Sequence, residues 1–490
     1  MLLSNVLKDL KERKKLNFKK FNPDIKGVHF NSQKILKDFI FVAIKGENND
    51  GHKYIDEAIK KGAIFFVIEN KKIKKNLEKK KINFIFTENS KFFLSKIASN
   101  FYINQPKKIS AVTGTNGKTS VTFITKEIWK NCNVKSASIG TLGLIADEYK
   151  KKLELTTENS VKIHKILSIL HKKKINHVCC EASSHGLDQH RLDNIKLDVA
   201  AFTNISQDHF DYHKTFQNYF NSKMRLFLKI LKKGGVAIIN SDLPETKKIL
   251  NLCKKNKIKT FTYGYNSTDL KLVTFYEENN VQRIMVNHKN KIFNYTIPII
   301  GNFQIYNSLC AICLAYFSGI SINKCLKAIK KIPQIPGRLE SIKIPRKLKK
   351  KISIFIDYAH TPDALKKTLE TLKKNSVKLS VVFGCGGNRD RKKRPLMGKI
   401  ANDFADKVYI TDDNPRDESP KKIRKDIISS CTKAIEIKNR YLAIKQAINN
   451  CEEGEKLLIA GKGHEDYQII GKKIYKFSDK DTVLKVLKNI

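Results

Sequence analysis

The chain has 490 residues, of which 41% are hydrophobic, and a formal net charge of +48. This length is too great for a single hydrophobic core and predicts about three domains. No apolar run is long enough to span a bilayer and the first residues lack a signal-peptide pattern, so we expect a cytoplasmic protein without a membrane partner.

The positive charge comes mostly from lysines spread along the whole chain, as in KKIKKNLEKKK at residues 71–81. Basic proteins can bind nucleic acid, because Lys and Arg displace counterions from phosphates. This sequence carries none of the signatures of the common nucleic-acid-binding modules. We therefore expect no nucleic-acid partner and a solvated basic surface that favours anionic substrates.

Ten cysteines are scattered along the chain, which predicts reduced thiols rather than a disulfide framework. Cys310 and Cys313 form one CxxC pair inside an apolar, helix-like segment. No second pair lies near them, so we favour packing in a helix over a metal or redox role.

The first part of the chain alternates strand-like runs at 40–44, 63–69 and 82–87 with Lys-rich helical segments, which predicts a small α/β domain over residues 1–106. The pattern restarts near Gln105-Pro106. Apolar runs at 109–113, 177–181, 198–203 and 236–240 then alternate with helices, as in a doubly wound sheet, and predict a central domain over 107–334.

The last segment, 335–490, has strand-like runs near 353–357, 378–383, 407–411 and 456–460. These alternate with helical segments and predict a Rossmann-like sheet. The predicted fold class is therefore α/β with three domains, of which the central one carries a phosphate-binding loop (P-loop).

That loop is the sequence GTNGKTS, which follows an apolar strand and precedes a helix. Its glycines let backbone N–H groups surround phosphate oxygens, Lys118 can neutralise phosphate charge, and the Thr119 hydroxyl can reach Mg²⁺. The loop departs from the strict Walker pattern, which requires glycine where Val112 stands, so an ordinary strand-to-helix turn stays the alternative. The candidate nucleotide-binding residues of the loop are Gly114, Thr115, Asn116, Gly117, Lys118, Thr119 and Ser120.

Polar residues also follow the next two strands. Glu181 ends the strand in VCCEASSHGLDQHR and is a candidate Mg²⁺ ligand, while His209 in FTNISQDHFDYH could be a second metal or phosphate contact. Magnesium prefers oxygen ligands, which makes a histidine less expected. His209 and His213 also have the spacing of a zinc-binding helix, but the glutamate of a zincin motif is missing.

Three loops after strands of the last segment contain glycine or arginine: FGCGGNRDRKKRPLMG at 383–398, DNPRDESP at 413–420 and GKGHEDYQ at 461–468. The planar guanidinium of Arg416 suits a carboxylate. Arginine is used sparingly in this chain, so we expect Arg191, Arg338, Arg389 and Arg416 to serve bidentate contacts, with a plain surface position as the alternative.

Taken in order, twelve motifs resemble the Mur ligases of peptidoglycan synthesis over nearly the whole chain. They are NSQ (31–33) with VAIKG, GTNGKTS, TTENS (156–160), EASSHGLDQHR, TNISQDH, YFNSK (219–223), GNFQIYN (301–307), PGRLE (336–340), DYAHTPDAL (357–365), GCGGNRDRKKRPLMG, DNPR and GKGHEDYQ.

The resemblance implies an ATP-dependent ligase that joins meso-2,6-diaminopimelate to UDP-N-acetylmuramoyl-L-alanyl-D-glutamate. The D-Glu γ-carboxylate would attack the ATP γ-phosphate, and the amine would then displace phosphate from the acyl phosphate. ATP and Mg²⁺ are the implied cofactors, and we expect a monomer. The alternatives are the same ligase acting on L-lysine or a ligase similar to folylpolyglutamate synthase.

The resemblance also implies roles for individual residues. Lys118, His209 and Lys223 would be catalytic, with Lys223 carbamylated and acting with Thr119, Glu181 and His209 on the metal. ATP would further contact Asn307, Arg338 and Asp357. The muramyl substrate would contact Ser32, Thr156, Thr157, Ser183, Gln189 and Arg191, and diaminopimelate would contact Arg389, Asp413, Asn414, Pro415, Arg416, Gly461 and Glu465.

The DNPR motif bears on the choice of amino acid. Diaminopimelate has a second carboxylate at its far end, whereas L-lysine would leave Arg416 unpaired at a cost of about 1–3 kcal/mol. The sequence therefore favours diaminopimelate. It departs from the family pattern at Asn31, Gln33, Leu155 and Gln304, which concerns the uridine and adenine contacts.

Overall fold

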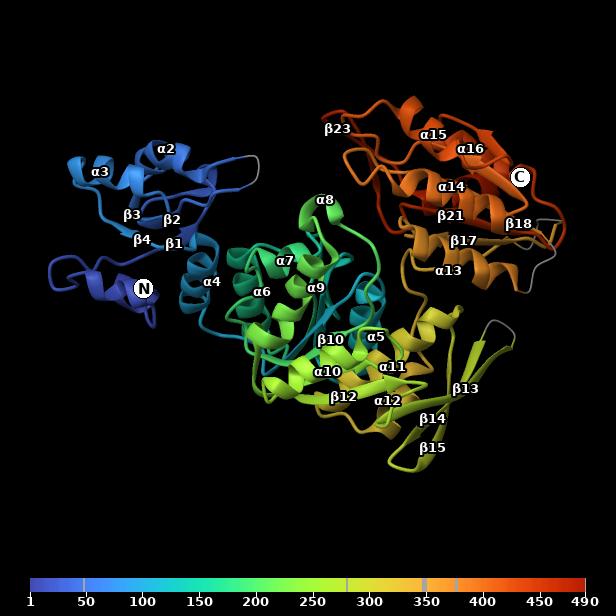
Figure 1. Ribbon diagram of the computed structural model, residues 1–490, viewed down its shortest axis with the longest axis horizontal. Helices are drawn as coiled ribbons and strands as arrows, with labels where there is room; N and C mark the ends of the chain where they lie inside the picture. The colour runs from blue at the N-terminus through green and yellow to red at the C-terminus, as the bar shows by residue number, and fades with distance from the viewer. Residues whose placement is uncertain (47–48, 279–280, 346–349, 375–377, 490) are drawn as a thin grey trace.

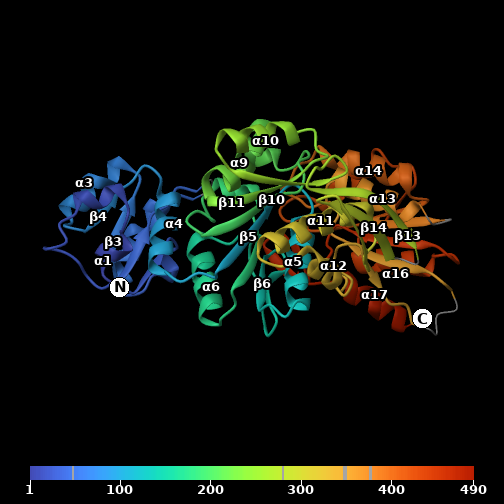
Figure 2. The ribbon, with the colours of Figure 1, turned by 90° about the horizontal axis from the view of Figure 1, so that it is seen from below.

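The computed structural model describes residues 1–46, 49–278, 281–345, 350–374 and 378–489. Figure 1 shows three lobes in chain order, each built on a β-sheet with helices packed against it. In Figure 2 the central lobe lies between the other two. This architecture confirms the predicted α/β class. None of the helices within these ranges is long and apolar enough to cross a membrane.

The N-terminal sheet has four parallel strands in the order β1-β2-β3-β4. The strands are β1 (Gly27–His29), β2 (Phe39–Val42), β3 (Ala63–Ile68) and β4 (Phe84–Phe86), and the helices are α1 (Leu3–Val6), α2 (Ile55–Lys60), α3 (Lys71–Lys79) and α4 (Ser90–Phe101). Alternate residues of β3 face two apolar layers, Phe65 and Val67 on one side and Phe66 on the other. The three predicted strands coincide with β2, β3 and β4.

The central sheet has eleven strands, and its parallel part runs β13-β12-β11-β10-β5-β9-β6, where β13 is Leu270–Glu278. These strands are β5 (Lys108–Thr113), β6 (Ser136–Gly140), β9 (His177–Glu181), β10 (Leu197–Phe202), β11 (Leu231–Asn240) and β12 (Lys259–Gly264). The order reverses on either side of β5, as expected for a doubly wound sheet.

Helices cover both faces of this parallel part. On one face lie α5 (Lys118–Asn131), α11 (Asn302–Phe317) and α12 (Ile322–Ile329); on the other lie α6 (Ser160–Lys172), α9 (Phe216–Arg225) and α10 (Thr246–Lys255). Cys310 and Cys313 are unpaired and buried inside α11. Burial raises the pKa of the Cys310 thiol to about 12, which agrees with packing in a helix rather than redox chemistry.

Antiparallel strands extend both edges of the central sheet and were not predicted. They are β7 (Gly143–Ala146) and β8 (Tyr149–Lys151) beside β6, and β14 (Val281–His288) and β15 (Lys291–Ile297) beside β13 (Leu270–Glu278). The exposed or half-buried positions of β8, β14 and β15 carry Lys, Arg and Asn, so these three strands lack the apolar runs of the parallel strands, whereas β7 is short, with four residues.

The C-terminal sheet has the order β16-β17-β21-β18-β19-β20, and only β16 is antiparallel. The strands are β16 (Glu340–Ile342), β17 (Ser353–Asp357), β18 (Leu379–Phe383), β19 (Lys407–Ile410), β20 (Ala434–Glu436) and β21 (Lys456–Ala460). The four strands predicted here coincide with β17, β18, β19 and β21.

Helices pack on both faces of this sheet, with α13 (Pro362–Lys373), α14 (Lys393–Phe404) and α15 (Pro420–Ile428) on one and α16 (Arg440–Asn449) and α17 (Asp479–Lys488) on the other. A separate hairpin, β22 (Tyr467–Ile470) and β23 (Lys473–Lys476), follows β21. The carboxyl ends of β17, β18, β19 and β21 therefore meet at one edge, where the DYAH, GCGG, DNPR and GKGHE segments begin.

Candidate active site

The P-loop connects β5 to α5 and has the glycines that its geometry needs. Gly117 precedes α5 with φ +87°, and a Cβ there would lie 2.4 Å from Asn307 Oδ1. A Cβ on Gly114 would lie 1.9 Å from Thr203 Oγ1. Both positions therefore exclude a side chain, which keeps backbone N–H groups accessible at the helix N-terminus.

Lys118 bends back over this loop, and its Nζ donates to the carbonyls of Gly114 and Thr115, both at 2.8 Å. Burial lowers the pKa of its ammonium, against the opposing effect of Glu181. An anion held by the loop would add countercharge beside this half-buried cation.

Thr119 and Glu181 form a polar pair beside the loop. The Thr119 hydroxyl donates to Glu181 Oε2 at 2.9 Å and accepts from Arg338 Nη2 at 3.1 Å, while Thr141 N donates to Glu181 Oε1 at 2.7 Å. Hydroxyl and carboxylate oxygens are the donors that Mg²⁺ prefers, so this pair fits a magnesium ion next to a bound phosphate.

His209 is the first residue after Asp208 in the loop beyond β10, and it adopts φ +57° just before the short helix α8 (Phe210–His213). Its Nε2 lies 3.3 Å from Asp208 Oδ2. Burial lowers the pKa of His209 to about 3, so the imidazole is neutral and can act as a ligand or an acceptor. Within the described residues, no group of three or more His, Cys, Asp or Glu side chains is arranged to hold a metal.

Lys223 lies on α9 and is almost fully buried. Its Nζ donates to the Gly114 carbonyl at 2.8 Å and sits 4.3 Å from the centre of the Tyr219 ring. Burial and the nearby Lys118 charge hold the pKa of Lys223 well below its usual range. The two lysines therefore approach the same carbonyl of the P-loop from different helices.

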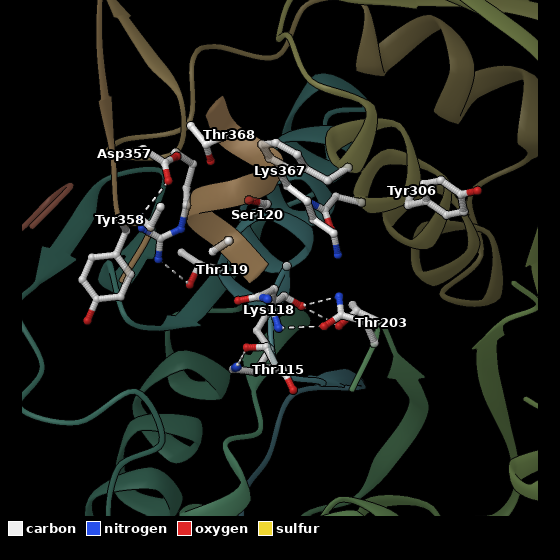
Figure 3. A pocket seen from close by; sticks show the side chains of 18 of the residues that line it. Thr115, Lys118, Thr119, Ser120, Thr203, Tyr306, Asp357, Tyr358, Lys367 and Thr368 are labelled. Atoms are coloured by element: carbon white, nitrogen blue, oxygen red, sulfur yellow. Dashed lines mark hydrogen bonds between the residues drawn. The ribbon is translucent and has the colours of Figure 1, made fainter. Parts of the chain in front are cut away.

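A cavity of about 970 Å³ opens between the P-loop and the C-terminal sheet. Figure 3 shows Lys118 and Thr119 around it together with Asp357, the last residue of β17, and Tyr358, which follows it. Asn116 Nδ2 donates to Asp363 Oδ2 at 3.0 Å across the junction. The nucleotide-binding candidates that line the cavity are Thr115, Asn116, Gly117, Lys118, Thr119, Ser120, Asn307, Arg338 and Asp357.

Asp357 has an unusual environment in this wall. Its carboxylate accepts from Leu339 N at 2.5 Å and Ala359 N at 2.8 Å. Burial raises the pKa of Asp357 to about 6 despite the nearby Arg338 charge. Such a raised pKa on a buried carboxyl in a cavity wall is typical of functional sites.

The residues expected to bind the muramyl substrate fall in two places. Thr156 and Ser183 line the cavity, whereas Thr157, Gln189 and Arg191 are not among its lining residues. The Thr157 hydroxyl accepts from Ser183 N at 2.9 Å, which joins the two groups. Arg191 Nη1 donates to the Thr157 carbonyl at 2.7 Å and its Nη2 to Gln189 Oε1 at 2.6 Å. Ser32 is not among the cavity residues; it belongs to the N-terminal lobe, where its hydroxyl donates to Glu57 Oε2 at 2.7 Å.

The residues expected to bind diaminopimelate gather at the carboxyl edge of the C-terminal sheet. Asn414 Nδ2 donates to Glu465 Oε2 at 3.0 Å, and a Cβ on Gly461 would lie 2.7 Å from Asp413 Oδ2. Arg416 Nη1 donates to the Gly387 carbonyl at 2.8 Å. Pro415 is buried between Asn414 and Arg416.

Arg389 is exposed, and its Nη1 donates to the neighbouring Asn388 carbonyl at 3.1 Å. Burial, reinforced by the charge of Arg389, lowers the pKa of Arg416. Two guanidinium groups thus share one side of this cluster, which suits the binding of a carboxylate.

Sequence reasoning missed several polar residues at these sites. Asp208, Tyr358 and His360 line the cavity, and Lys462 is fully buried beside Asn414. All four lie inside motifs that the sequence analysis singled out, so the motif was the available signal. Which side chain of each motif turns inward depends on local backbone geometry that the sequence pattern does not give.

Three family models match the chain in succession: "Mur ligase family, catalytic domain" over residues 24–102, "Mur ligase middle domain" over 112–315 and "Mur ligase, glutamate ligase domain" over 337–463. A protein of Rickettsia conorii named UDP-N-acetylmuramoyl-L-alanyl-D-glutamate--2,6-diaminopimelate ligase is 42% identical over 474 residues, which cover 95% of this chain and 96% of the relative. The chain belongs to the Mur ligase family.

A Mur ligase of the same name from Agrobacterium fabrum is 38% identical over 465 residues, covering 95% of this chain and 93% of the relative. A solved structure of a ligase with that name superimposes with a TM-score of 0.66 at 29% identity, covering 95% of both chains. MurF from Thermotoga maritima in complex with ADP (TM-score 0.63, 19% identity, 94% of this chain and 97% of MurF) shares the fold.

Folylpolyglutamate synthase of Mycobacterium tuberculosis, solved with ADP and AMPPCP, has a TM-score of 0.60 at 16% identity and covers 74% of this chain and 90% of its own. At that identity only a common fold follows. The alternative of a ligase similar to folylpolyglutamate synthase is therefore weaker than the Mur ligase interpretation, whose relatives align over nearly the whole chain.

Proposed function

We propose that this Mur ligase joins meso-2,6-diaminopimelate to UDP-N-acetylmuramoyl-L-alanyl-D-glutamate at the expense of ATP. The observation that carries the proposal is that the P-loop and the C-terminal sheet line the same cavity. The arginine-containing loops proposed to bind the amino acid lie at the edge of that sheet. The names of the 38–42% identical relatives support the same substrates.

In the first step, an oxygen of the D-Glu γ-carboxylate forms a bond to the γ-phosphorus of ATP, and ADP leaves. The Lys118 ammonium neutralises charge on the phosphates, and the P-loop N–H groups hold them in line. A bound Mg²⁺ would neutralise further phosphate charge, and Thr119 and Glu181 would hold it with His209 as a neutral neighbour. Asn307, Arg338 and Asp357 would contact the nucleotide from the junction.

We further propose that Lys223 reacts with CO₂ and becomes a carbamate. A neutral amine forms the N–C bond and releases one proton, so a neutral side chain becomes an anion. The lowered pKa of Lys223 supports this, because it favours the neutral form of the amine, which is the form that reacts with CO₂. The anion would lie beside the Lys118 ammonium, whose charge favours it.

In the second step, the amine of diaminopimelate attacks the acyl carbon and phosphate leaves. Arg416 and Arg389 would bind the far carboxylate of the amino acid, and Glu465 with Asp413 would bind its ammonium group. Thr156, Thr157, Ser183, Gln189 and Arg191 would bind the muramyl peptide, and Ser32 would bind the uridine end.

We expect the enzyme to act as a monomer in the cytoplasm, with domains at 1–106, 107–334 and 335–490. Each of the three sheets lies within one of these ranges. The domain boundaries themselves stay predictions.

The function is tested by measuring phosphate release from ATP with UDP-N-acetylmuramoyl-L-alanyl-D-glutamate and either meso-diaminopimelate or L-lysine. We expect release to require the muramyl substrate and to be faster with diaminopimelate. Preference for L-lysine would contradict the role of Arg416, and no release with either amino acid would contradict the proposed reaction.

A further inference from the structure

Lys462 follows Gly461 at the end of β21, and its side chain has no exposed area. Removing an ammonium group from water is costly unless charged or polar partners surround it. A lysine at such a position, in a chain whose other lysines lie mostly at the surface, therefore needs specific partners. Those partners are two of the residues proposed to bind the amino acid.

The Lys462 ammonium donates to Glu465 Oε2 at 3.0 Å and to Asn414 Oδ1 at 3.2 Å. Asn414 Nδ2 in turn donates to the same Glu465 Oε2 at 3.0 Å. These three hydrogen bonds close a triangle among the side chains of Lys462, Asn414 and Glu465. Lys462 also lies 5.5 Å from the centre of the Tyr467 ring, which covers the ammonium.

The triangle fixes the orientation of the Asn414 amide. Its Oδ1 accepts from both Lys462 Nζ and Ile469 N, the latter at 3.0 Å. A flipped amide would direct its NH₂ group at two donors and its oxygen at the Glu465 carboxylate. Lys462 therefore determines which group of Asn414 is available on the Glu465 side.

The same contacts hold one oxygen of Glu465. Two donors occupy Oε2, whereas no hydrogen bond to Oε1 comes from the residues that the structure describes. The Glu465 side chain keeps 14% of its surface exposed. One carboxylate oxygen is thus anchored to the protein, and the other can accept a hydrogen bond from a donor group of a ligand.

We propose that Lys462 is a positioning residue for the amino-acid substrate: it anchors Glu465 and Asn414 so that the second carboxylate oxygen of Glu465 faces the ammonium group of diaminopimelate. This inference rests on the proposed function. Lys462 acts through its two neighbours and is not among the described residues that line the P-loop cavity, so its loss should affect the amino acid alone.

The test compares Lys462→Met with the matched control Lys472→Met, which removes an exposed lysine from the nearby hairpin. We expect Lys462→Met to raise the KM for diaminopimelate by about 10- to 100-fold, the range for losing a hydrogen bond to a charged group. The KM values for ATP and the muramyl substrate should change by less than about twofold. Lys472→Met should behave as wild type.

A double-mutant cycle separates positioning from a general structural role. If Lys462 acts through Glu465, the Lys462→Met change should have little further effect on the KM for diaminopimelate in a Glu465→Gln background. Additive effects, or a uniform rise in all three KM values, would overturn the proposal. Without diaminopimelate, a single turnover should still form ADP when the muramyl substrate is present. Lys462→Met should keep this activity, because the substitution does not change the P-loop.

Lys462→Arg keeps the test decisive if the Met variant does not fold. It retains the charge but changes the geometry, and we expect a smaller rise, confined to the KM for diaminopimelate; an unchanged KM would overturn the proposal. The wild-type enzyme is measured first. If the wild-type enzyme turns over without diaminopimelate, the proposed function is refuted. If wild-type turnover requires diaminopimelate but Lys462→Met has an unaltered KM for it, only the role of Lys462 is refuted.

Discussion

Replacing Lys223 by Met removes the buried amine and keeps most of the aliphatic stem. The amine donates one hydrogen bond, to the Gly114 carbonyl at 2.8 Å, so the free energy of unfolding should fall by only about 0.5–1.5 kcal/mol. If this amine carries the proposed carbamate, the same change removes an anion from the site of phosphoryl transfer. The kcat should then fall by about 100-fold or more, the usual effect of losing one electrostatic group at a reacting centre.

The matched control is Lys229→Met, which removes an exposed lysine from the turn after α9. Phosphate release gives kcat for each variant, and thermal unfolding gives Tm, which should drop by about 2–4 °C per kcal/mol in Lys223→Met. Wild-type turnover should fall in CO₂-free buffer and recover with bicarbonate. Turnover of Lys223→Met close to that of Lys229→Met, with no bicarbonate effect on the wild type, would refute the reasoning.

Three further outcomes are expected. Arg416→Lys should lower kcat/KM for diaminopimelate by about 10- to 100-fold at an unchanged KM for ATP, measured by phosphate release, because Lys cannot pair with a carboxylate bidentately. Gly117→Ala should weaken ATP binding, measured by calorimetry, since its Cβ would lie 2.4 Å from Asn307 Oδ1 at φ +87°. Burial raises the pKa of Asp357 from 3.8 to about 6. The folded protein therefore binds a proton on this carboxyl group more tightly than the unfolded chain does. The stabilisation that results is complete below pH 3.8 and disappears above pH 6. Between pH 5 and pH 7.5 the wild type should therefore lose about 1 kcal/mol more unfolding free energy in denaturant titrations than Asp357→Asn. Equal pH dependence would contradict the raised pKa.

The strands that form the floor of the site could be predicted because they are buried on both faces. The runs at 109–113 (ISAVT) and 456–460 (KLLIA) are mostly apolar, and both are central strands whose neighbours are parallel. The antiparallel strands β14 and β15 have one solvent-facing side with Lys and Asn, so their apolar residues do not form such runs. Edge strands of three residues, such as β1, are too short to show any period.

The polar residues at strand ends were predictable for the same topological reason, since parallel strands bring their carboxyl ends to one edge. Glu181 and Asp357 are examples, and both lie at the cavity. Burial of individual lysines was not predictable. Lys223 and Lys462 look like many other lysines in the sequence, and only the packing around α9 and β21 distinguishes them.

The central claim is that the D-Glu γ-carboxylate is activated as an acyl phosphate before diaminopimelate attacks it. It is tested most directly with UDP-N-acetylmuramoyl-L-alanyl-D-glutamate labelled with ¹⁸O in the γ-carboxylate, followed by mass spectrometry of the phosphate released in the presence of ATP and diaminopimelate. The proposed mechanism predicts one labelled oxygen in each phosphate, because the carboxylate oxygen leaves with it. Released phosphate without label would contradict the mechanism.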